Sequence, residues 1–207
     1  MTLLNYWITP KKAIVAVDTQ AMILEAPDSL RDLSKMLYLP HANVILAGRG
    51  SVDMLYLAYI RLLQIGTHFD MIRDLLDAHL TTFAKDAKMQ MERHGTALPA
   101  MRQELLLVGY SDSSSSMQVR LFTIDLEGAV TSDDRRHDAR PSIAHPVQGQ
   151  WLKNPNSIGA MHRLACEQVV WADTDGSGAS FGGRLLYAEL TKDSLNMGSV
   201  GELRQAP

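Results

Sequence analysis

The chain has 207 residues, of which 46% are apolar and 21% are charged, a composition typical of folded globular proteins. A net charge of −3 lacks the basic excess of a nucleic-acid-binding protein, and the single cysteine, Cys166, excludes an internal disulfide. No apolar run reaches the roughly 18–20 residues that cross a bilayer, and residues 3–8 are too short for a signal peptide. We therefore expect a soluble, cytoplasmic protein that needs no cofactor and binds neither nucleic acid nor membrane.

The first 50 residues read as two strand pairs. Residues 3–8 and 13–17 are rich in strand-forming residues and flank a polar turn that contains Pro10, so they predict a β-hairpin that ends at Asp18. Residues 25–29 have the composition of a loop. Residues 35–39 and 44–47 then predict a second hairpin, which runs into the segment 48–51.

Two helices are predicted next. Ser51 is a suitable N-cap, and residues 52–65 are apolar almost all round, so we expect this helix to be buried on more than one side. Gly66 is expected to end it. A second helix over residues 68–92 has a narrower apolar stripe and an acidic and basic far side, so it should be the outer member of the pair.

The second half of the chain predicts mostly strands. Residues 103–110 and 117–126 form a hairpin around a serine-rich turn, and residues 131–155 are rich in loop-forming residues. A helix is predicted over 157–170 and a last strand over 183–190, followed by a polar tail from 191 to 207.

Strands grouped with strands and helices with helices favour the α+β class. We expect one domain over residues 1–207 with its core in residues 2–190. A four-layer α-β-β-α sandwich of two mostly antiparallel sheets would use every predicted element.

Several local matches resemble the proteasome β-subunit family of N-terminal-nucleophile hydrolases. Thr2 lies 16 residues before Asp18, which closes a family-like AIVAVDTQA segment, and Lys35 opens the second hairpin, KMLYLPHANVILAG. Residues 47–51 lead directly into a long helix, and residues 181–183 place a Gly-Gly pair before the last strand. The resemblance covers about residues 2–190 and implies the four-layer fold, a catalytic N-terminal threonine and assembly into homo-oligomeric rings.

The residue types at these positions suit nucleophilic catalysis by an N-terminal threonine. A threonine hydroxyl needs a neighbouring base, and an N-terminal threonine carries one in its own α-amine, whose pKa is ordinarily about 7.7–8.0. A cation at Lys35 would lower the pKa of that amine, and Asp18 would be the counter-charge of the lysine. The backbone N–H of Gly48, between a strand and a helix, could stabilise an oxyanion. The resemblance assigns functional roles to the same set, Thr2, Asp18, Lys35 and Gly48.

The chain departs from the family pattern near the late Gly-Gly pair. Gly178 and Phe181 stand where the family carries an aspartate and a serine, although four candidate substitutes lie nearby: Asp173, Asp175, Ser177 and Ser180. Ser142 is a candidate for the supporting serine of the middle loop. Met1 precedes Thr2 and must be removed before Thr2 has a free amine.

Other motifs in the sequence give weaker evidence for a functional site. Residues 173–177 resemble the start of a calcium-binding EF-hand loop, but the twelfth position is Arg184 where a glutamate is required. The spacing of His137, His145 and His162 does not fit a metal site, and Cys166 suits a small core residue.

The sequence therefore predicts a threonine-type hydrolase that cleaves peptide or amide bonds after removal of Met1. The alternatives are a non-catalytic ring or assembly subunit of the same fold, and a module that binds an anion at the helix N-terminus after residues 48–51. A homo-oligomeric ring or helical array is expected in either of the first two cases, and the sequence leaves any ATPase partner unknown.

Overall fold

The computed structural model describes residues 2–23, 26–93, 102–135, 140–142, 155–174 and 181–204. These residues form an α+β structure with three helices and three sheets, and every strand pair is antiparallel. No helix among them is long and apolar enough to span a membrane.

The first five-stranded sheet contains both ends of the described chain. Its strand order is β10-β1-β2-β11-β12, and its bounds are β1 Leu4–Ile8, β2 Lys12–Asp18, β10 Arg140–Ser142, β11 Arg184–Thr191 and β12 Leu195–Glu202. The central strand β2 explains the uninterrupted apolar run of the sequence, because both of its faces are buried. Val15 and Val17 face one apolar cluster, whereas Ile14 and Ala16 face another.

The second five-stranded sheet has the order β5-β6-β7-β8-β9. Its strands are β5 Met36–Leu39, β6 Val44–Arg49, β7 Gln103–Ser111, β8 Ser116–Ile124 and β9 Val130–Arg135. A separate two-stranded sheet pairs β3 Gln20–Ile23 with β4 Ala26–Asp32.

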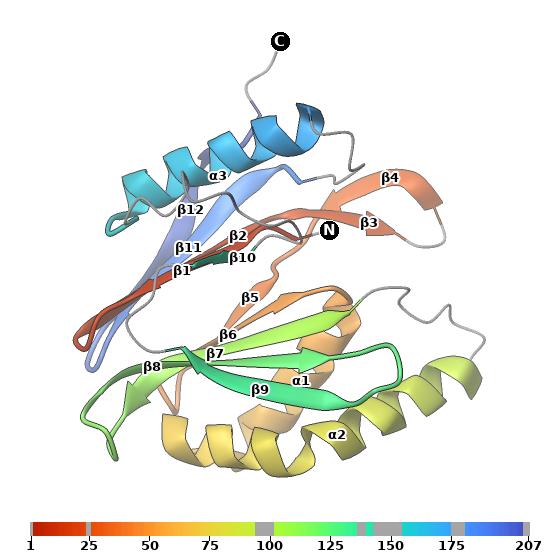
Figure 1. Cartoon of the computed structure of the whole chain (residues 1–207), viewed down its shortest axis with the longest axis vertical. Helices are drawn as coiled ribbons and strands as arrows, with labels where there is room; N and C mark the ends of the chain where they lie inside the picture. The colour runs from red at the N-terminus through yellow and green to blue at the C-terminus, as the bar shows by residue number, and fades with distance from the viewer. Residues whose placement is uncertain are drawn as a thin grey trace.

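Three apolar clusters connect these elements (Figure 1). Helices α1 Val52–Ile65 and α2 Phe69–Arg93 pack on the outer side of the β5–β9 sheet, through residues such as Leu55, Phe69 and Leu107. Helix α3 Ile158–Thr174 packs on the outer side of the other large sheet. The two large sheets face each other across a third cluster that includes Val17 and Val108.

Three polar segments and the end of one helix differ from the sequence expectations. The expected loop at 25–29 contains the start of β4, and the loop-rich segment 131–155 contains β9 and β10. The expected polar tail contains β12, which pairs with β11 along its length. The third helix extends to Thr174, four residues beyond its predicted end.

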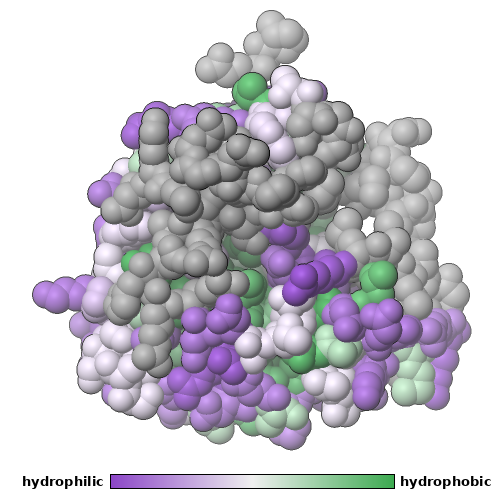
Figure 2. Space-filling model, viewed as in Figure 1, coloured by the Kyte–Doolittle hydropathy of each residue, from purple (hydrophilic) through white to green (hydrophobic). Residues whose placement is uncertain are grey.

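The prediction for α1 is confirmed in its bounds and wrong in its burial. Met54, Leu55 and Leu62 lie in the core, but Tyr56, Leu57, Ile60 and Leu63 on the opposite side are 36–52% exposed. Helix α2 is the more polar of the two, and hydrophilic residues are prominent over the region of α2 and β9 in Figure 2. The apolar side of α1 is therefore a surface, not a second buried face.

Gly66 ends α1 as predicted, but close packing, not a left-handed backbone, explains the glycine. Its φ is −108°, its N–H donates to Leu62 O at 3.3 Å, and a Cβ here would lie 2.2 Å from Ile72 Cγ1. A side chain of any size would push the start of α2 away from the core.

We predict that Gly66→Ala lowers the free energy of unfolding by about 1–3 kcal/mol, because the added methyl overpacks Ile72. Urea unfolding followed by circular dichroism measures this change. Gly159→Ala in α3 is the matched control, since a Cβ there meets only Arg163 Nη1 at 3.8 Å. Equal effects of the two substitutions would contradict the packing account.

Candidate functional site

A buried carboxylate lies at the centre of the candidate site. Asp18, the last residue of β2, is 0% exposed and accepts hydrogen bonds from three segments of the chain. Its Oδ1 accepts the N–H of Leu3 at 2.8 Å and the Nζ of Lys35 at 2.9 Å, and its Oδ2 accepts the N–H of Gly182 at 3.3 Å. The carboxylate thus joins the start of the chain, the entry to β5 and the entry to β11.

The Lys35 ammonium is enclosed with its partner. Lys35 is 3% exposed, and its Nζ donates hydrogen bonds to Asp18 and to the carbonyl oxygen of Gln20. Burial raises the pKa of the Asp18 carboxyl and lowers the pKa of Lys35, and in each case the charge of the partner opposes the shift. A lysine whose pKa is lowered can exchange a proton closer to neutral pH than a solvated one.

Thr2 lies close to the Asp18–Lys35 pair because the next residue, Leu3, is hydrogen-bonded to Asp18. Leu3 makes two bonds to Asp18, because its carbonyl oxygen also accepts the Asp18 backbone N–H at 3.2 Å. Oδ1 of Asp18 is shared, so the Lys35 ammonium lies within two hydrogen-bond lengths of the Leu3 N–H. Thr2 precedes Leu3 directly and is 3% exposed. The structure therefore brings Asp18 and Lys35 into contact and places Thr2 next to Leu3, which is bound to the same carboxylate.

The backbone N–H of Gly48, in contrast, already donates a hydrogen bond within the protein. The group donates to the carbonyl oxygen of Lys35 at 3.0 Å, so it is not directed freely at an incoming ligand. A Cβ on Gly48 would lie 3.3 Å from Leu55 Cβ, which gives the glycine a packing role under α1. The expectation that Gly48 holds an oxyanion is not supported by this geometry.

Arg49 is a buried cation that the sequence analysis missed. Its side chain is 9% exposed, and its Nη1 lies 3.6 Å from Glu104 Oε2 on the adjacent strand β7. Burial lowers the pKa of Arg49, and the charges of Glu104 and Asp18 oppose that shift. The apolar run VILAG before Arg49 indicates that this charge needs a partner, but it does not indicate which residue supplies it.

The segment before β11 fits tightly against the residues after Asp18. Gln20 N–H donates to Gly182 O at 3.1 Å, and a Cβ on Gly182 would lie 2.3 Å from Gln20 Oε1. Gly183 has a φ of +68°, and a Cβ there would lie 2.3 Å from Thr19 Oγ1. Gly183 is thus required by its left-handed backbone and by its close approach to Thr19, directly after Asp18, whereas Gly182 lies against the end of the Gln20 side chain.

The structure describes only some of the residues that were expected to support Thr2. Asp173 forms an ion pair with Arg204 at 2.6 Å near the end of α3, and it takes no part in the hydrogen bonds to Asp18 described above. Ser142 lies in β10 opposite Leu4, on the strand beside β1. Asp175, Ser177, Gly178 and Ser180 lie outside the described residues, as do Met1, His137 and His145.

The remaining histidine and cysteine do not form a metal site. His162 Nε2 lies 3.8 Å from Cys166 Sγ, one turn along α3. Burial, followed by the charge of Glu167, raises the pKa of the Cys166 thiol, which makes it a poorer nucleophile. The described part of the chain contains no group of three or more side chains that could hold a metal ion.

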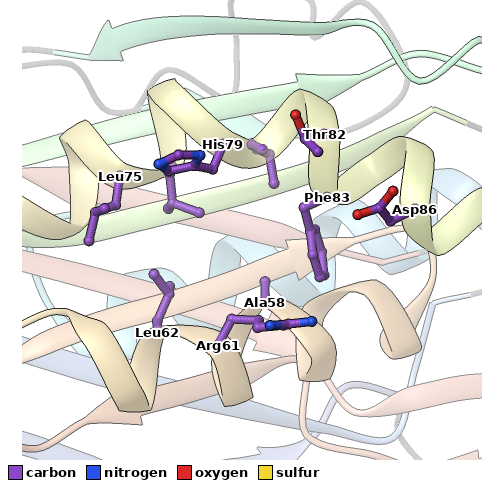
Figure 3. Close-up of a pocket in the computed structure, with 10 residues that line it drawn as sticks. Ala58, Arg61, Leu62, Leu75, His79, Thr82, Phe83 and Asp86 are labelled. Carbon is purple, nitrogen blue, oxygen red and sulfur yellow. The ribbon is translucent and has the colours of Figure 1, made fainter.

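A cavity of about 260 Å³ lies elsewhere, between α1 and α2 (Figure 3). Its walls are mostly apolar, with Leu62 from α1 and Leu75 and Phe83 from α2, and Arg61, His79 and Asp86 add polar groups. None of its lining residues belongs to the Asp18 hydrogen-bond network. This cavity is therefore separate from the candidate active site.

We predict that Lys35→Met lowers the free energy of unfolding by about 3–5 kcal/mol, because it leaves the Asp18 charge buried without its cation. The double variant Asp18→Asn/Lys35→Met removes both charges and should be more stable than Lys35→Met alone. Urea unfolding gives these values.

Lys12→Met is the matched control, since the Lys12–Glu189 pair at 3.3 Å is partly exposed and should contribute less than about 1 kcal/mol. A Lys35→Met variant as stable as Lys12→Met would contradict the buried pair described above.

Comparison with known proteins shows a shared fold at low sequence identity. A scan against protein-family models and a search of curated proteins found no match. Among solved structures, the Anbu (Gly-1) mutant from Hyphomicrobium sp. strain MC1 aligns with a TM-score of 0.58 and 14% identity, over 98% of this chain and 86% of that one. Anbu (ancestral beta-subunit) from Yersinia bercovieri aligns with a TM-score of 0.60 and 12% identity, over 95% and 86%. At these identities the similarity shows the fold.

Proposed function

We propose that this chain is a threonine-type N-terminal-nucleophile hydrolase that cleaves peptide or amide bonds once Met1 has been removed. In this proposal the two large sheets and the three helices form the four-layer α-β-β-α sandwich of the proteasome β-subunit family. The observation that carries the proposal is the convergence of Leu3 N–H and Lys35 Nζ on one oxygen of Asp18, directly beside Thr2. The shared fold with the two Anbu structures supports it.

Each residue has a distinct role. The Thr2 hydroxyl oxygen attacks the carbonyl carbon of the substrate, and its proton passes to the free α-amine of Thr2. The carbon–nitrogen bond then breaks, the departing amine takes that proton, and the acyl group remains on Thr2 as an ester. A water molecule gives a proton to the same α-amine, and its oxygen attacks the carbonyl carbon of the ester. The bond between that carbon and the Thr2 oxygen breaks, the Thr2 oxygen takes the proton back from the α-amine, and the acyl group leaves as a carboxylic acid.

Lys35 and Asp18 tune this reaction without reacting. The Lys35 ammonium favours the uncharged form of the nearby α-amine, which is the form that accepts the hydroxyl proton. Asp18 holds Lys35 in place and fixes Leu3, so it positions Thr2 through the backbone. Gly48 is left out of this set because its N–H is bound to Lys35 O.

A second candidate function is a non-catalytic ring or assembly subunit. The burial of Thr2, at 3% exposed, favours it, because a nucleophile that is enclosed meets no substrate. Removal of Met1 is required by the hydrolase and not by the non-catalytic subunit, and labelling of the Met1-free protein separates the two candidates. Both candidates include assembly of several copies into a ring or helical array, and the single cysteine fits the reducing cytoplasm.

We expect the Met1-free protein to be labelled covalently at Thr2 by a peptide epoxyketone, which captures both the hydroxyl and the amine of an N-terminal threonine. Thr2→Ser should keep the labelling, and Thr2→Val, which retains the shape but not the hydroxyl, should lose it. Intact mass spectrometry of the natively expressed protein reports both the loss of Met1 and the adduct.

Two outcomes would contradict the assignment. Labelling that persists in Thr2→Val places the nucleophile elsewhere in the chain. A Met1-free wild-type protein that is folded and never labelled favours the non-catalytic subunit.

A further inference from the structure

Two polar side chains are buried between α3 and the sheet that contains β1. Asn5 of β1 and Gln168 of α3 are both 0% exposed. Their side-chain amides exchange two hydrogen bonds: Asn5 Nδ2 donates to Gln168 Oε1 at 2.7 Å, and Gln168 Nε2 donates to Asn5 Oδ1 at 3.1 Å. Each amide thus supplies the other with one donor and one acceptor.

The surroundings of this amide pair are apolar. Leu3 and Trp7 lie on the same side of the chain as Asn5, and the side of α3 that faces them buries Met161 and Ala165 (Figure 1). Apolar contacts have no preferred direction, so they hold α3 on the sheet without fixing where along β1 it lies. Two amides that bond each other fit at one relative position only, because an amide that moves away is buried without a partner.

The start of β1 is paired unequally on its two sides. Of the two strands that pair with β1 among the described residues, only β2 pairs with its whole length. The other strand, β10, is three residues long, and its central residue, Pro141, lies opposite Asn5 and has no N–H to donate. Chain ends fray unless they are tied down, and removal of Met1 makes Thr2 the end of the chain. A contact with a third element, α3, is what this chain end has in addition to β2.

We propose that Asn5 and Gln168 are positioning residues for Thr2. Their amide pair anchors the start of β1 to α3, and it thereby keeps Leu3 on the Asp18 carboxylate and Thr2 next to it. Asn5 lies three residues after Thr2, and neither amide takes part in the hydrogen bonds to Asp18, so the pair acts through the backbone. The inference rests on the proposed function for the role of Thr2, whereas the anchoring of β1 is measurable without any catalysis.

The test replaces both amides by apolar side chains of nearly the same shape, in Asn5→Leu/Gln168→Met. The urea midpoint of the full chain should stay close to that of wild type, because two amides that satisfy each other are removed together. Backbone hydrogen–deuterium exchange in the peptide that covers residues 2–8, read by mass spectrometry, should nevertheless be at least about tenfold faster than in wild type. The apolar pair leaves the chain end free to open without unfolding the domain.

The single variants show whether the two amides depend on each other. Asn5→Leu and Gln168→Met each leave one amide buried without a partner, so each should unfold at a lower urea concentration than the double variant. Single variants that are as stable as the double variant would overturn the proposal, because the two amides would then not act as a pair.

A rescue variant and a packing control separate anchoring from general stability. Asn5→Gln/Gln168→Asn exchanges the two amides and keeps their combined length, so it should restore slow exchange in residues 2–8. Met161→Ala opens a cavity under α3 two turns from Gln168 and leaves both amides in place. Its exchange should rise over the whole sheet in proportion to its loss of stability, and not at the chain end alone.

The anchor and the proposed hydrolase fail separately. In the Met1-free protein, the double variant should react with the epoxyketone at least about tenfold more slowly than wild type, because Thr2 spends less time in its reactive position. A wild type that is never labelled removes the hydrolase, and the exchange rates still test the anchor. A folded double variant or rescue variant that exchanges against these expectations removes the anchor, whatever the labelling of wild type.

Discussion

The buried Asp18 carboxylate is the constraint on which the candidate site depends. A charge at the end of the central strand β2 costs several kcal/mol to bury unless it is paired and hydrogen-bonded. Asp18 meets that requirement with one ammonium and two backbone N–H groups that come from segments far apart in the sequence. The same bonds that satisfy the charge therefore place Thr2, Lys35 and the late Gly-Gly pair around one point. Structural stability and the proposed chemistry use the same contacts.

Most of the fold could be predicted from the sequence where burial imposes a pattern. The strands β2, β6 and β7 and the bounds of α1 follow from apolar runs and from turn residues. Five strands were missed. β4, β9, β10 and β12 are mostly polar, with β12 reading LNMGSVGE and β9 reading VTSDDR, whereas β3, which reads QAMI, is only four residues long. Among the described residues, β9 and β12 each pair with one neighbouring strand only, and none of the β12 residues is fully buried, so burial imposes no apolar pattern on it.

The site was predictable to the extent that it depends on spacing along the chain. Asp18 and Lys35 end and begin adjacent hairpins, and their contact was expected for that reason. The Gly48 bond to Lys35 O depends on the register between β5 and β6, and the Arg49–Glu104 contact depends on the register between β6 and β7. Register is set by the tertiary structure, so no local pattern could reveal either contact. The exposed side of α1 was missed for a related reason, because an apolar helix face has the same sequence pattern whether it meets its own core or another chain.

A fold constrains fewer individual residues of a sequence than a catalytic mechanism does. This difference explains how the chain aligns over nearly its whole length with Anbu structures at 12–14% identity. A core tolerates many apolar substitutions that keep volume and pattern, so a fold persists when few residues match. The proposed chemistry depends on a handful of atoms: a hydroxyl and a free amine on Thr2, an ammonium on Lys35 and a carboxylate on Asp18. The ammonium and the carboxylate are in contact, and the amine exists only after Met1 is removed. The proposed activity therefore depends on one proteolytic event at the N-terminus, which supplies the amine, as well as on the fold, which supplies the contact between Lys35 and Asp18.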